Sequence, residues 1–157
     1  MDADAFAWIT LRSVYAWMYL YPALGLIRNW SVTVSTTGLL FKTGTVFFAF
    51  GSMVVMIVGS LMILFGLYGQ FAAVALFGFN LGGAVIHYRL GAMAKATQLS
   101  ESASNQDQAT VAELANLGQV GHVTSAEKNF VLAAVALFFA LVGTGKMSLI
   151  SAAGIFG

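Results

Sequence analysis

Residues 45–88 form an apolar stretch that contains no Lys, Arg, Asp or Glu. Its first part, residues 45–68, is long enough to cross a hydrocarbon layer of about 30 Å as a helix. A short break at Tyr68-Gly69-Gln70 separates it from a second apolar run, which predicts a helix near residues 71–90. Backbone polar groups in lipid must be satisfied within the helix, so the two runs predict an antiparallel helical hairpin in a bilayer.

The composition of the whole chain agrees with this membrane interpretation. Of its 157 residues, 59% are hydrophobic and 8% are charged, whereas a soluble domain carries about 25% charged residues. The net charge of +1 provides no strongly basic surface for nucleic acid. The chain has no cysteine, which excludes disulfides and cysteine-ligated zinc or iron–sulfur centres. The sequence therefore predicts an integral, multi-pass membrane protein.

Two further apolar runs complete the predicted membrane region. The first predicts a helix near residues 5–27. The last predicts a helix near residues 125–143, directly after the capping-box pattern Thr124-Ser-Ala-Glu127. We therefore expect one all-α domain over residues 1–157, an integral membrane four-helix bundle with both termini on the same side of the membrane.

Two polar connections join these helices. Residues 28–43 are rich in Ser and Thr, and the alternation at residues 30–35 is compatible with a short extended segment or a plain loop. Residues 91–124 form the larger polar segment, in which residues 92–99 are expected to extend the third helix past the membrane. Within the same segment, Thr110-Val-Ala-Glu113 predicts a short amphipathic helix near residues 110–117. The positive-inside rule places both loops on the cytoplasmic side of an inner (cytoplasmic) membrane. The basic residues that flank the two loops are Arg28, Lys42, Arg89, Lys95 and Lys128.

Arg12 interrupts the first apolar run, and two interpretations of it are open. Its side chain can snorkel to the interface. Alternatively it points into the bundle and pairs with a polar group, because a charge in lipid costs at least about 2.5 kcal/mol. The same helix carries an aromatic-rich face, part of which we interpret as an interfacial belt. Its members are Trp8, Tyr15, Trp17, Tyr19 and Tyr21.

The third predicted helix carries Asn80 and His87, which share one face because they are seven residues apart. Asn80 lies near mid-helix and needs a polar partner in the bundle or a partner protein, such as Arg12 or the headgroup of a lipid or quinone. His87 is either an interfacial histidine beside Arg89, or it contacts a quinone, a haem or a chlorophyll-type pigment. His122 falls in the predicted polar loop, which disfavours a bis-histidine haem.

No nucleophile–base pair, carboxylate pair or metal-ligand cluster can be placed from the sequence. We therefore assign no catalytic or metal-ligating residue. The candidate cofactor contacts, to a quinone, lipid or other group, are Arg12, Asn80, His87 and Arg89. Gly78-xxx-Gly82 matches the spacing that lets two helices approach closely, either within the chain or between two copies.

Several stretches resemble the DoxX-like family of small four-helix membrane proteins. Residues 50–91 are similar to that family's central hairpin, in which a helix with a late Leu-Phe-Gly-Leu turn precedes one that ends in a histidine-containing segment. Gly143-Thr-Gly-Lys-Met-Ser-Leu149 is similar to the end of the family's last helix, and Leu11-Arg12 to its leading pair. The chain departs from the family at Gly25-Leu-Ile-Arg28 and in its longer segment at residues 89–124.

This resemblance implies a membrane subunit near quinone redox chemistry. Family members serve in membrane oxidoreductase assemblies, including one for the quinone-linked oxidation of thiosulfate. We therefore expect a non-catalytic accessory or anchoring subunit of a larger membrane redox complex, with other integral membrane subunits and lipid as its partners. The alternatives are a quinone-reactive catalytic subunit and a haem- or pigment-binding subunit that uses His87.

Overall fold

The computed structural model describes residues 2–150, and helices account for all of the regular elements in that range apart from one isolated β-bridge. A π-helical turn, η1 (Val55–Gly59), joins α3 to α4 without a break. The all-α prediction is confirmed. The α-helices are α1 (Ala3–Arg28), α2 (Trp30–Thr37), α3 (Thr45–Val54), α4 (Ser60–Phe65), α5 (Gly69–Lys95) and α6 (Asn105–Val142).

Three helical rods are long and apolar enough to cross a membrane: the continuous α3–η1–α4 rod, α5 and α6. The first two correspond to the hairpin predicted from residues 45–88, and the turn between them is formed by residues 66–68. Helix α1 has 26 residues and is long enough to span as well, but it carries Arg12 and is not among the three most apolar rods.

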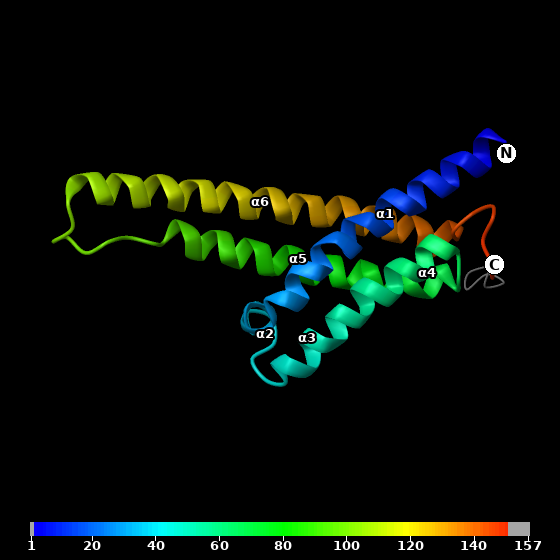
Figure 1. The fold of residues 1–157 in the computed structure, drawn as a ribbon, viewed down its shortest axis with the longest axis horizontal. Coiled ribbons are helices and arrows are strands. Elements are labelled where there is room, and N and C mark those ends of the chain that lie inside the picture. Colours follow the sequence, from blue (N-terminus) through cyan, green and yellow to red (C-terminus); the bar gives the residue numbers. More distant parts are fainter. Residues whose placement is uncertain (1, 151–157) are drawn as a thin grey trace.

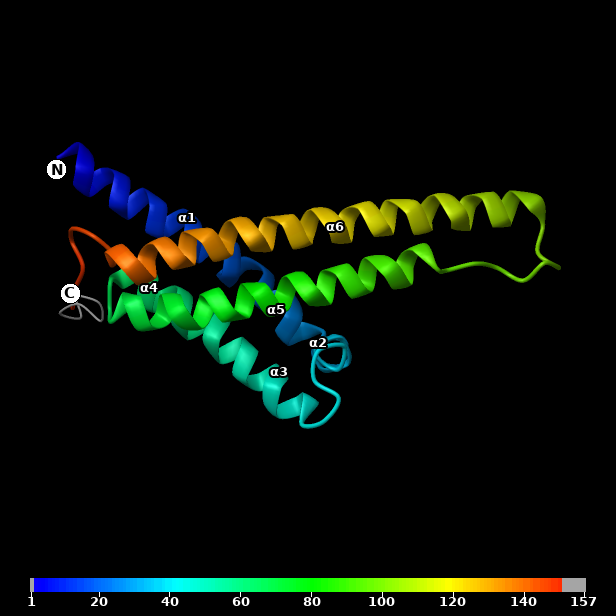
Figure 2. The same cartoon turned by 180° about the vertical axis from the view of Figure 1, so that it is seen from behind.

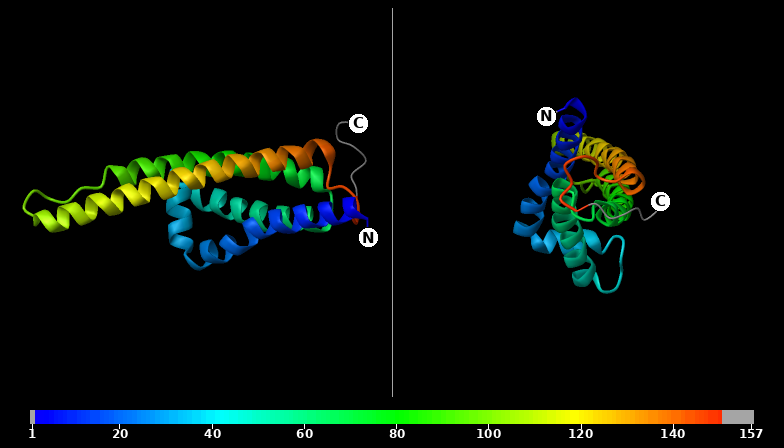
Figure 3. Two further views of the ribbon diagram at one scale, coloured as in Figure 1. Left: turned by 90° about the horizontal axis from the view of Figure 1, so that it is seen from above. Right: turned by 90° about the vertical axis from the view of Figure 1, so that its right-hand side faces the viewer.

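Helices α5 and α6 lie side by side and antiparallel, and α1 and the α3–η1–α4 rod pack together on one flank of this pair (Figures 1 and 2). Helix α2 runs across the end of this layer and connects α1 to α3 (Figure 3). The prediction of an extended segment or plain loop at residues 30–35 is wrong, because α2 is helical there. Threonine hydroxyls of α2 donate hydrogen bonds to backbone carbonyls. The Thr33 hydroxyl donates to the Leu26 carbonyl at the end of α1, and the Thr37 hydroxyl donates to the Thr33 carbonyl within α2.

The buried core fills the space where α1, the α3–η1–α4 rod, α5 and α6 meet. It combines large side chains with alanines, so that helices approach closely around a few bulky groups. Ile63, Leu76 and Phe139 are completely buried in it. Close packing of this kind fixes the relative positions of the polar groups that lie among these side chains.

The larger polar loop is much shorter than predicted. Helix α5 continues to Lys95 and α6 begins at Asn105, so the loop comprises residues 96–104 and not residues 91–124. The separate short helix near residues 110–117 and the helix start at residue 125 are also wrong, because both positions lie inside one helix of 38 residues. We call the hairpin formed by residues 88–121, which projects beyond α1–α4, the stalk (Figures 1 and 3).

The N-cap of α6 is Ser104, and not Thr110 or Thr124, the two residues predicted to begin helices. Ser104 Oγ accepts a hydrogen bond from the Asp107 amide at 3.1 Å and donates to the Asp107 carboxylate at 2.7 Å. The Thr110 and Thr124 hydroxyls instead donate to the carbonyls of Gln106 and Val120, four residues earlier. Both threonine patterns therefore lie in a helix interior, where such back-bonding is common.

The segment after α6, residues 143–150, folds back over the ends of the helices. Its Leu149 and Ile150 amides donate to the Phe65 and Gly66 carbonyls at 3.1 and 3.0 Å, and the Tyr68 amide donates to Ile150 at 3.2 Å. This pairing forms the one parallel β-bridge in the described residues, between Leu67 and Ile150. We call residues 143–150 the C-terminal segment.

Ion pairs tie the same segment to the start of α1. Lys146 Nζ lies 3.2 Å from an Asp2 oxygen and 2.9 Å from an Asp4 oxygen, and all three side chains are exposed. The Ala5 amide and the Lys146 ammonium hold the pKa of Asp2 below its ordinary value. The beginning of α1 and the end of α6 therefore meet at one end of the molecule, opposite the stalk (Figure 1).

Candidate functional site

Arg12 points into the protein and is only 3% exposed. Its guanidinium donates to the carbonyls of Lys146 and Met147 at 3.3 and 3.5 Å, and to Ser148 Oγ at 3.4 Å. Arg12 therefore pairs with polar groups of the C-terminal segment, as the second interpretation of this residue expects. Its Nε has no partner among the described residues.

Asn80 lies in the bundle interior, where it is completely buried. Its Nδ2 donates to Tyr19 Oη at 2.7 Å and to the Leu76 carbonyl at 2.6 Å. The Tyr19 hydroxyl donates to Tyr15 Oη at 2.8 Å, and Tyr15 donates to the Leu132 carbonyl at 3.2 Å. This buried chain of hydrogen bonds links α5, α1 and α6 and satisfies the Asn80 Nδ2 donor, whereas Asn80 Oδ1 is buried without a partner among the described residues.

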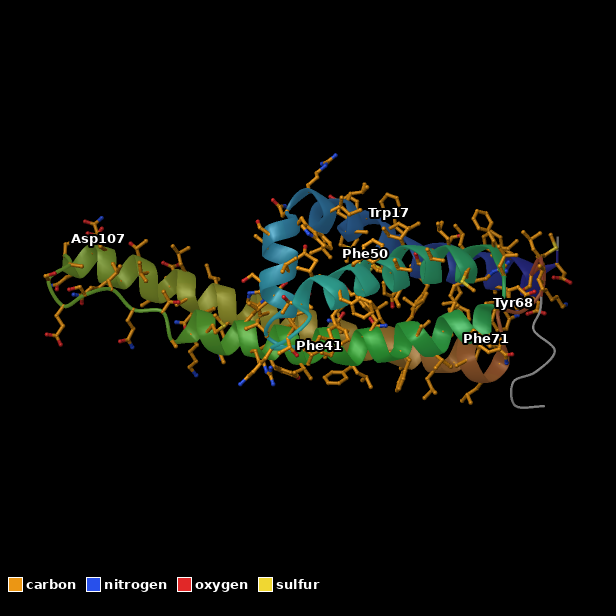
Figure 4. All side chains as sticks on the ribbon, turned by 90° about the horizontal axis from the view of Figure 1, so that it is seen from below. Trp17, Phe41, Phe50, Tyr68, Phe71 and Asp107 are labelled. Carbon is orange, nitrogen blue, oxygen red and sulfur yellow. The ribbon has the colours of Figure 1, made fainter. Side chains whose placement is uncertain are left out.

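The aromatic face of α1 is in fact two faces with different roles. Tyr15 and Tyr19 are 2% exposed and form the buried chain with Asn80. Trp17 and Tyr21 project outward and stack on each other with ring centroids 5.6 Å apart. Figure 4 shows Trp17 among the apolar side chains around α1 and α3. Tyr15 and Tyr19 lie three and seven residues after Arg12, on the same face of the helix, and sharing a face with this charge was the signal that could have separated them from the interfacial belt.

His87 contacts His122, which the sequence prediction had placed in a loop. The two Nδ1 atoms are 3.2 Å apart, so one imidazole donates a hydrogen bond to the other. The prediction for His122 is wrong because α6 extends through residue 122 and packs against α5 at the base of the stalk. Gly91 permits this approach, since a methyl group there would already contact His122 Cβ at 3.4 Å.

Direct contact between the two imidazoles leaves no space for a porphyrin between them, so a haem ligated by both histidines does not fit this arrangement. Within residues 2–150, no three His, Cys, Asp or Glu side chains gather in a group that could hold a metal ion. The pair is thus a helix–helix contact between α5 and α6.

The four candidate cofactor contacts do not form a single site. Arg12 lies beneath the C-terminal segment, Asn80 lies in the core, and His87 lies at the base of the stalk. Arg89 is exposed on the outside of α5. Both hydrogens of the Asn80 amide are used within the chain, which leaves no donor there for a quinone oxygen.

A groove of about 1060 Å³ opens between α1, α2, α3, η1, α5 and α6. Its inner part is apolar, with Met18, Met56 and Phe79 among the lining side chains, and Tyr19 lies at its wall. The π-helical turn contributes Val55 and Met56, and turns of this type often occur at functional sites. Most of the polar lining residues come from α2, the later part of α5 and the facing part of α6: Asn29, Thr33, Thr36, Thr37, His87, Ser125, Lys128 and Asn129, with Ser52 contributed by α3.

Glycines give the groove its width. A methyl group built on Gly25, Gly51 or Gly78 meets no atom within 4 Å, and each of these residues lines the groove. Gly78 therefore does not bring two helices of this chain together, which contradicts the close packing within the chain predicted from Gly78-xxx-Gly82; packing between two copies stays a prediction. At Gly82 a methyl group would meet Leu40 at 3.2 Å, so this second glycine accommodates a side chain of the α2–α3 connection.

The outward face of α6 in the stalk is apolar although the stalk is otherwise polar. Leu114, Leu117 and Val120 are 61%, 62% and 63% exposed. They recur at three-residue intervals and so lie on one face of the helix. Figure 4 shows Asp107 at the far end of the stalk, away from α1, α2 and α3. Contiguous exposed apolar side chains of this kind mark surfaces that contact lipid or another protein.

Comparison of the chain with protein-family models, with curated proteins and with solved structures finds no match.

Proposed function

We propose that this chain is a non-catalytic subunit that stabilises a larger membrane complex. Four helical rods, α1, α3–η1–α4, α5 and α6, cross the bilayer as a bundle in this proposal, and the stalk extends into the aqueous phase. The observation that carries the proposal is the apolar face of Leu114, Leu117 and Val120 on the stalk. Lipid cannot cover this face if the stalk stands in water, so a partner subunit must do so.

The charge distribution supports an orientation with the stalk in the cytoplasm. Arg28 and Lys42 flank the α1–α3 connection, while Arg89, Lys95 and Lys128 belong to the stalk or its base. At the opposite end, Lys146 is neutralised by Asp2 and Asp4. Basic residues favour the cytoplasmic face of a membrane, so the stalk would meet its partner there. Both chain ends would then face the other side of an inner membrane.

The redox character of the complex rests on the DoxX-like resemblance of residues 50–91 and 143–149 alone. A quinone-linked electron-transfer assembly is therefore the first complex in which to look for the chain. Within residues 2–150, the structure supports a bundle-forming role for the polar groups considered as cofactor contacts, because Arg12, Asn80 and His87 all bond to other parts of the chain.

Substitution of Leu117 by aspartate should release the chain from its complex. The charge would be forced into an apolar contact, where an unpaired carboxylate is strongly unfavourable. We expect the tagged wild-type chain, expressed at its natural level, to migrate on a native gel with other membrane subunits. Leu117→Asp should migrate as the free chain, at an unchanged total amount.

Asn116→Asp is the matched control, because Asn116 is exposed on the same turn but does not belong to the apolar face. It should migrate like the wild type. Three results would contradict the proposal: wild type that migrates alone, a band made only of copies of this chain, or Leu117→Asp in the complex. Quinone turnover by the purified chain alone would contradict its non-catalytic character.

A further inference from the structure

The polar end of the groove contains an amide with no partner. Asn129 is 9% exposed, lines the groove, and its side chain forms no hydrogen bond within the described residues. The Asn129 amide atoms are accessible from the groove, because the fully buried side-chain N and O atoms without a partner among the described residues are Arg12 Nε and Asn80 Oδ1. Next to it, Lys128 also lines the groove and forms no ion pair. An amide and an ammonium group, adjacent and both unpartnered, can donate together to one anionic group.

The charges around this end of the groove are mostly positive. Arg28, Lys42 and Arg89 each adjoin a residue that lines it, and Lys128 lines it directly. Glu127 is the one carboxylate within one residue of a lining position, and it is exposed. His87 faces the same region but already bonds to His122. The local field therefore favours a ligand with a negatively charged head.

The length of the groove matches one leaflet of a bilayer. Its α5 wall runs from Ala75 to Leu90, which is a rise of about 22 Å. One leaflet with its headgroup layer measures about 20–22 Å. Asn129 lies against Gly83, about 12 Å along this wall from Ala75, so the apolar part of the groove beside η1 covers most of the roughly 15 Å acyl-chain depth of one leaflet when Asn129 and Lys128 lie at its headgroup boundary.

We propose that the groove binds one anionic phospholipid from the leaflet on the stalk side. Lys128 and Asn129 hold its phosphate, and its acyl chains lie along η1 and the α5 wall in the space that Gly51 and Gly78 leave open. The lipid is an integral component of the bundle, because it fills a volume lined by five α-helices and a π-helical turn. This assignment requires the membrane orientation of the helices but does not require a partner subunit.

The test measures retained lipid on the whole chain. The chain is purified in mild detergent, stripped with excess detergent, and titrated in mixed micelles with dioleoyl phosphatidylglycerol, dioleoyl phosphatidylcholine or oleate. Native mass spectrometry then counts the bound molecules. We expect one phosphatidylglycerol per chain to be retained, at several-fold lower micelle content than phosphatidylcholine, and no comparable retention of oleate.

Variants separate the groove from the general surface. Gly78→Leu places a side chain into the groove where nothing contacts a built methyl group, and it should reduce phosphatidylglycerol binding at least tenfold. Gly51→Leu fills the groove from α3 and should also reduce phosphatidylglycerol binding at least tenfold. It replaces Gly78→Leu in the test if the Gly78→Leu variant does not fold. Gly121→Leu, on open stalk surface, should bind like the wild type. Lys128→Gln should weaken phosphatidylglycerol binding about fivefold without changing phosphatidylcholine binding, and Lys95→Gln should change neither.

Several results would overturn the proposal. Equal binding of both phospholipids by the wild type would remove the anionic head as the recognised group. Preferential retention of oleate would assign the groove to a single-chain fatty acid. Unchanged binding in folded Gly78→Leu or Gly51→Leu would place the lipid elsewhere on the surface. None of these results depends on whether Leu117→Asp leaves a complex, so the two proposals fail separately.

Discussion

Gly66→Ala should destabilise the protein by about 2–5 kcal/mol, the largest effect that we expect for a change of one methyl group. Gly66 has φ +64°, a left-handed conformation in which a Cβ atom is strained. A methyl group at this position would also lie 2.6 Å from Ser148 Cα, which is backbone and cannot turn aside. The C-terminal segment must therefore move away from the α4–α5 turn.

The effect can be measured as the thermal midpoint of the chain in detergent, followed by near-ultraviolet circular dichroism. Gly121→Ala provides the control, because Gly121 lies inside α6 with nothing within 4 Å of the added methyl group. That change should leave the midpoint unchanged or raise it, since alanine favours a helix over glycine by up to about 1 kcal/mol. Equal midpoints for the Gly66→Ala variant and the wild type would show that the C-terminal segment does not pack as described.

Tyr19→Phe should lower stability by about 1–2 kcal/mol, which is near the upper end for hydrogen bonds between membrane helices. Tyr19 is the centre of the buried chain, because its hydroxyl accepts from Asn80 and donates to Tyr15. Removal of this one oxygen leaves a completely buried amide hydrogen with no acceptor and takes away a donor from Tyr15.

A double-mutant cycle with Asn80→Leu identifies the cause. Either single variant already breaks the hydrogen bond between Asn80 and Tyr19. The double variant should therefore be less destabilised than the sum of the two single variants, by about 0.6 kcal/mol or more. Tyr21→Phe removes the same atom from an outward-facing tyrosine of α1 and should have almost no effect. Strict additivity in the cycle, or an equal loss from Tyr21→Phe, would show that the buried chain does not contribute to stability.

The helical hairpin was predictable because its signal is a property of many residues. Because no residue over positions 45–88 is charged, the prediction of membrane-length helices there does not depend on any single side chain. Helices α3 and α4 lie in this stretch, and α5 lies mostly within it, as predicted. Arg12 and Asn80 were identified as residues that need polar partners, since burial of a polar group in an apolar environment has a large cost. Their actual partners were not predictable, because the contacts of Arg12 with Ser148 and of Asn80 with Tyr19 join distant parts of the chain.

The long α6 was missed because its first half has the composition of a loop. Gly118 and Gly121 weaken the helix locally, and polar side chains surround them. Packing against α5 overcomes this tendency. At Gly118 a methyl group would meet Ala94 at 3.2 Å, so the missing side chain is what lets the two helices approach. Gly118, which favours a loop when considered alone, is thus a contact residue in the structure. The pairing of His87 with His122 was not predicted because the start of α6 was placed too late in the sequence.

Helix α6 runs without a break from the bundle into the stalk, so a rotation of this helix in the bundle moves the far end of the stalk. Its stalk portion, residues 105–121, is about 25 Å long, and contacts at Gly91 and Gly118 join it to α5. Membrane helices differ in tilt by tens of degrees. A rotation of about 10° at the bilayer surface would sweep residues 96–104 sideways by about 4 Å. In the proposed membrane orientation, a small angular adjustment of the helices among lipids would thereby displace residues 96–104, outside the bilayer, by a distance as large as a side chain.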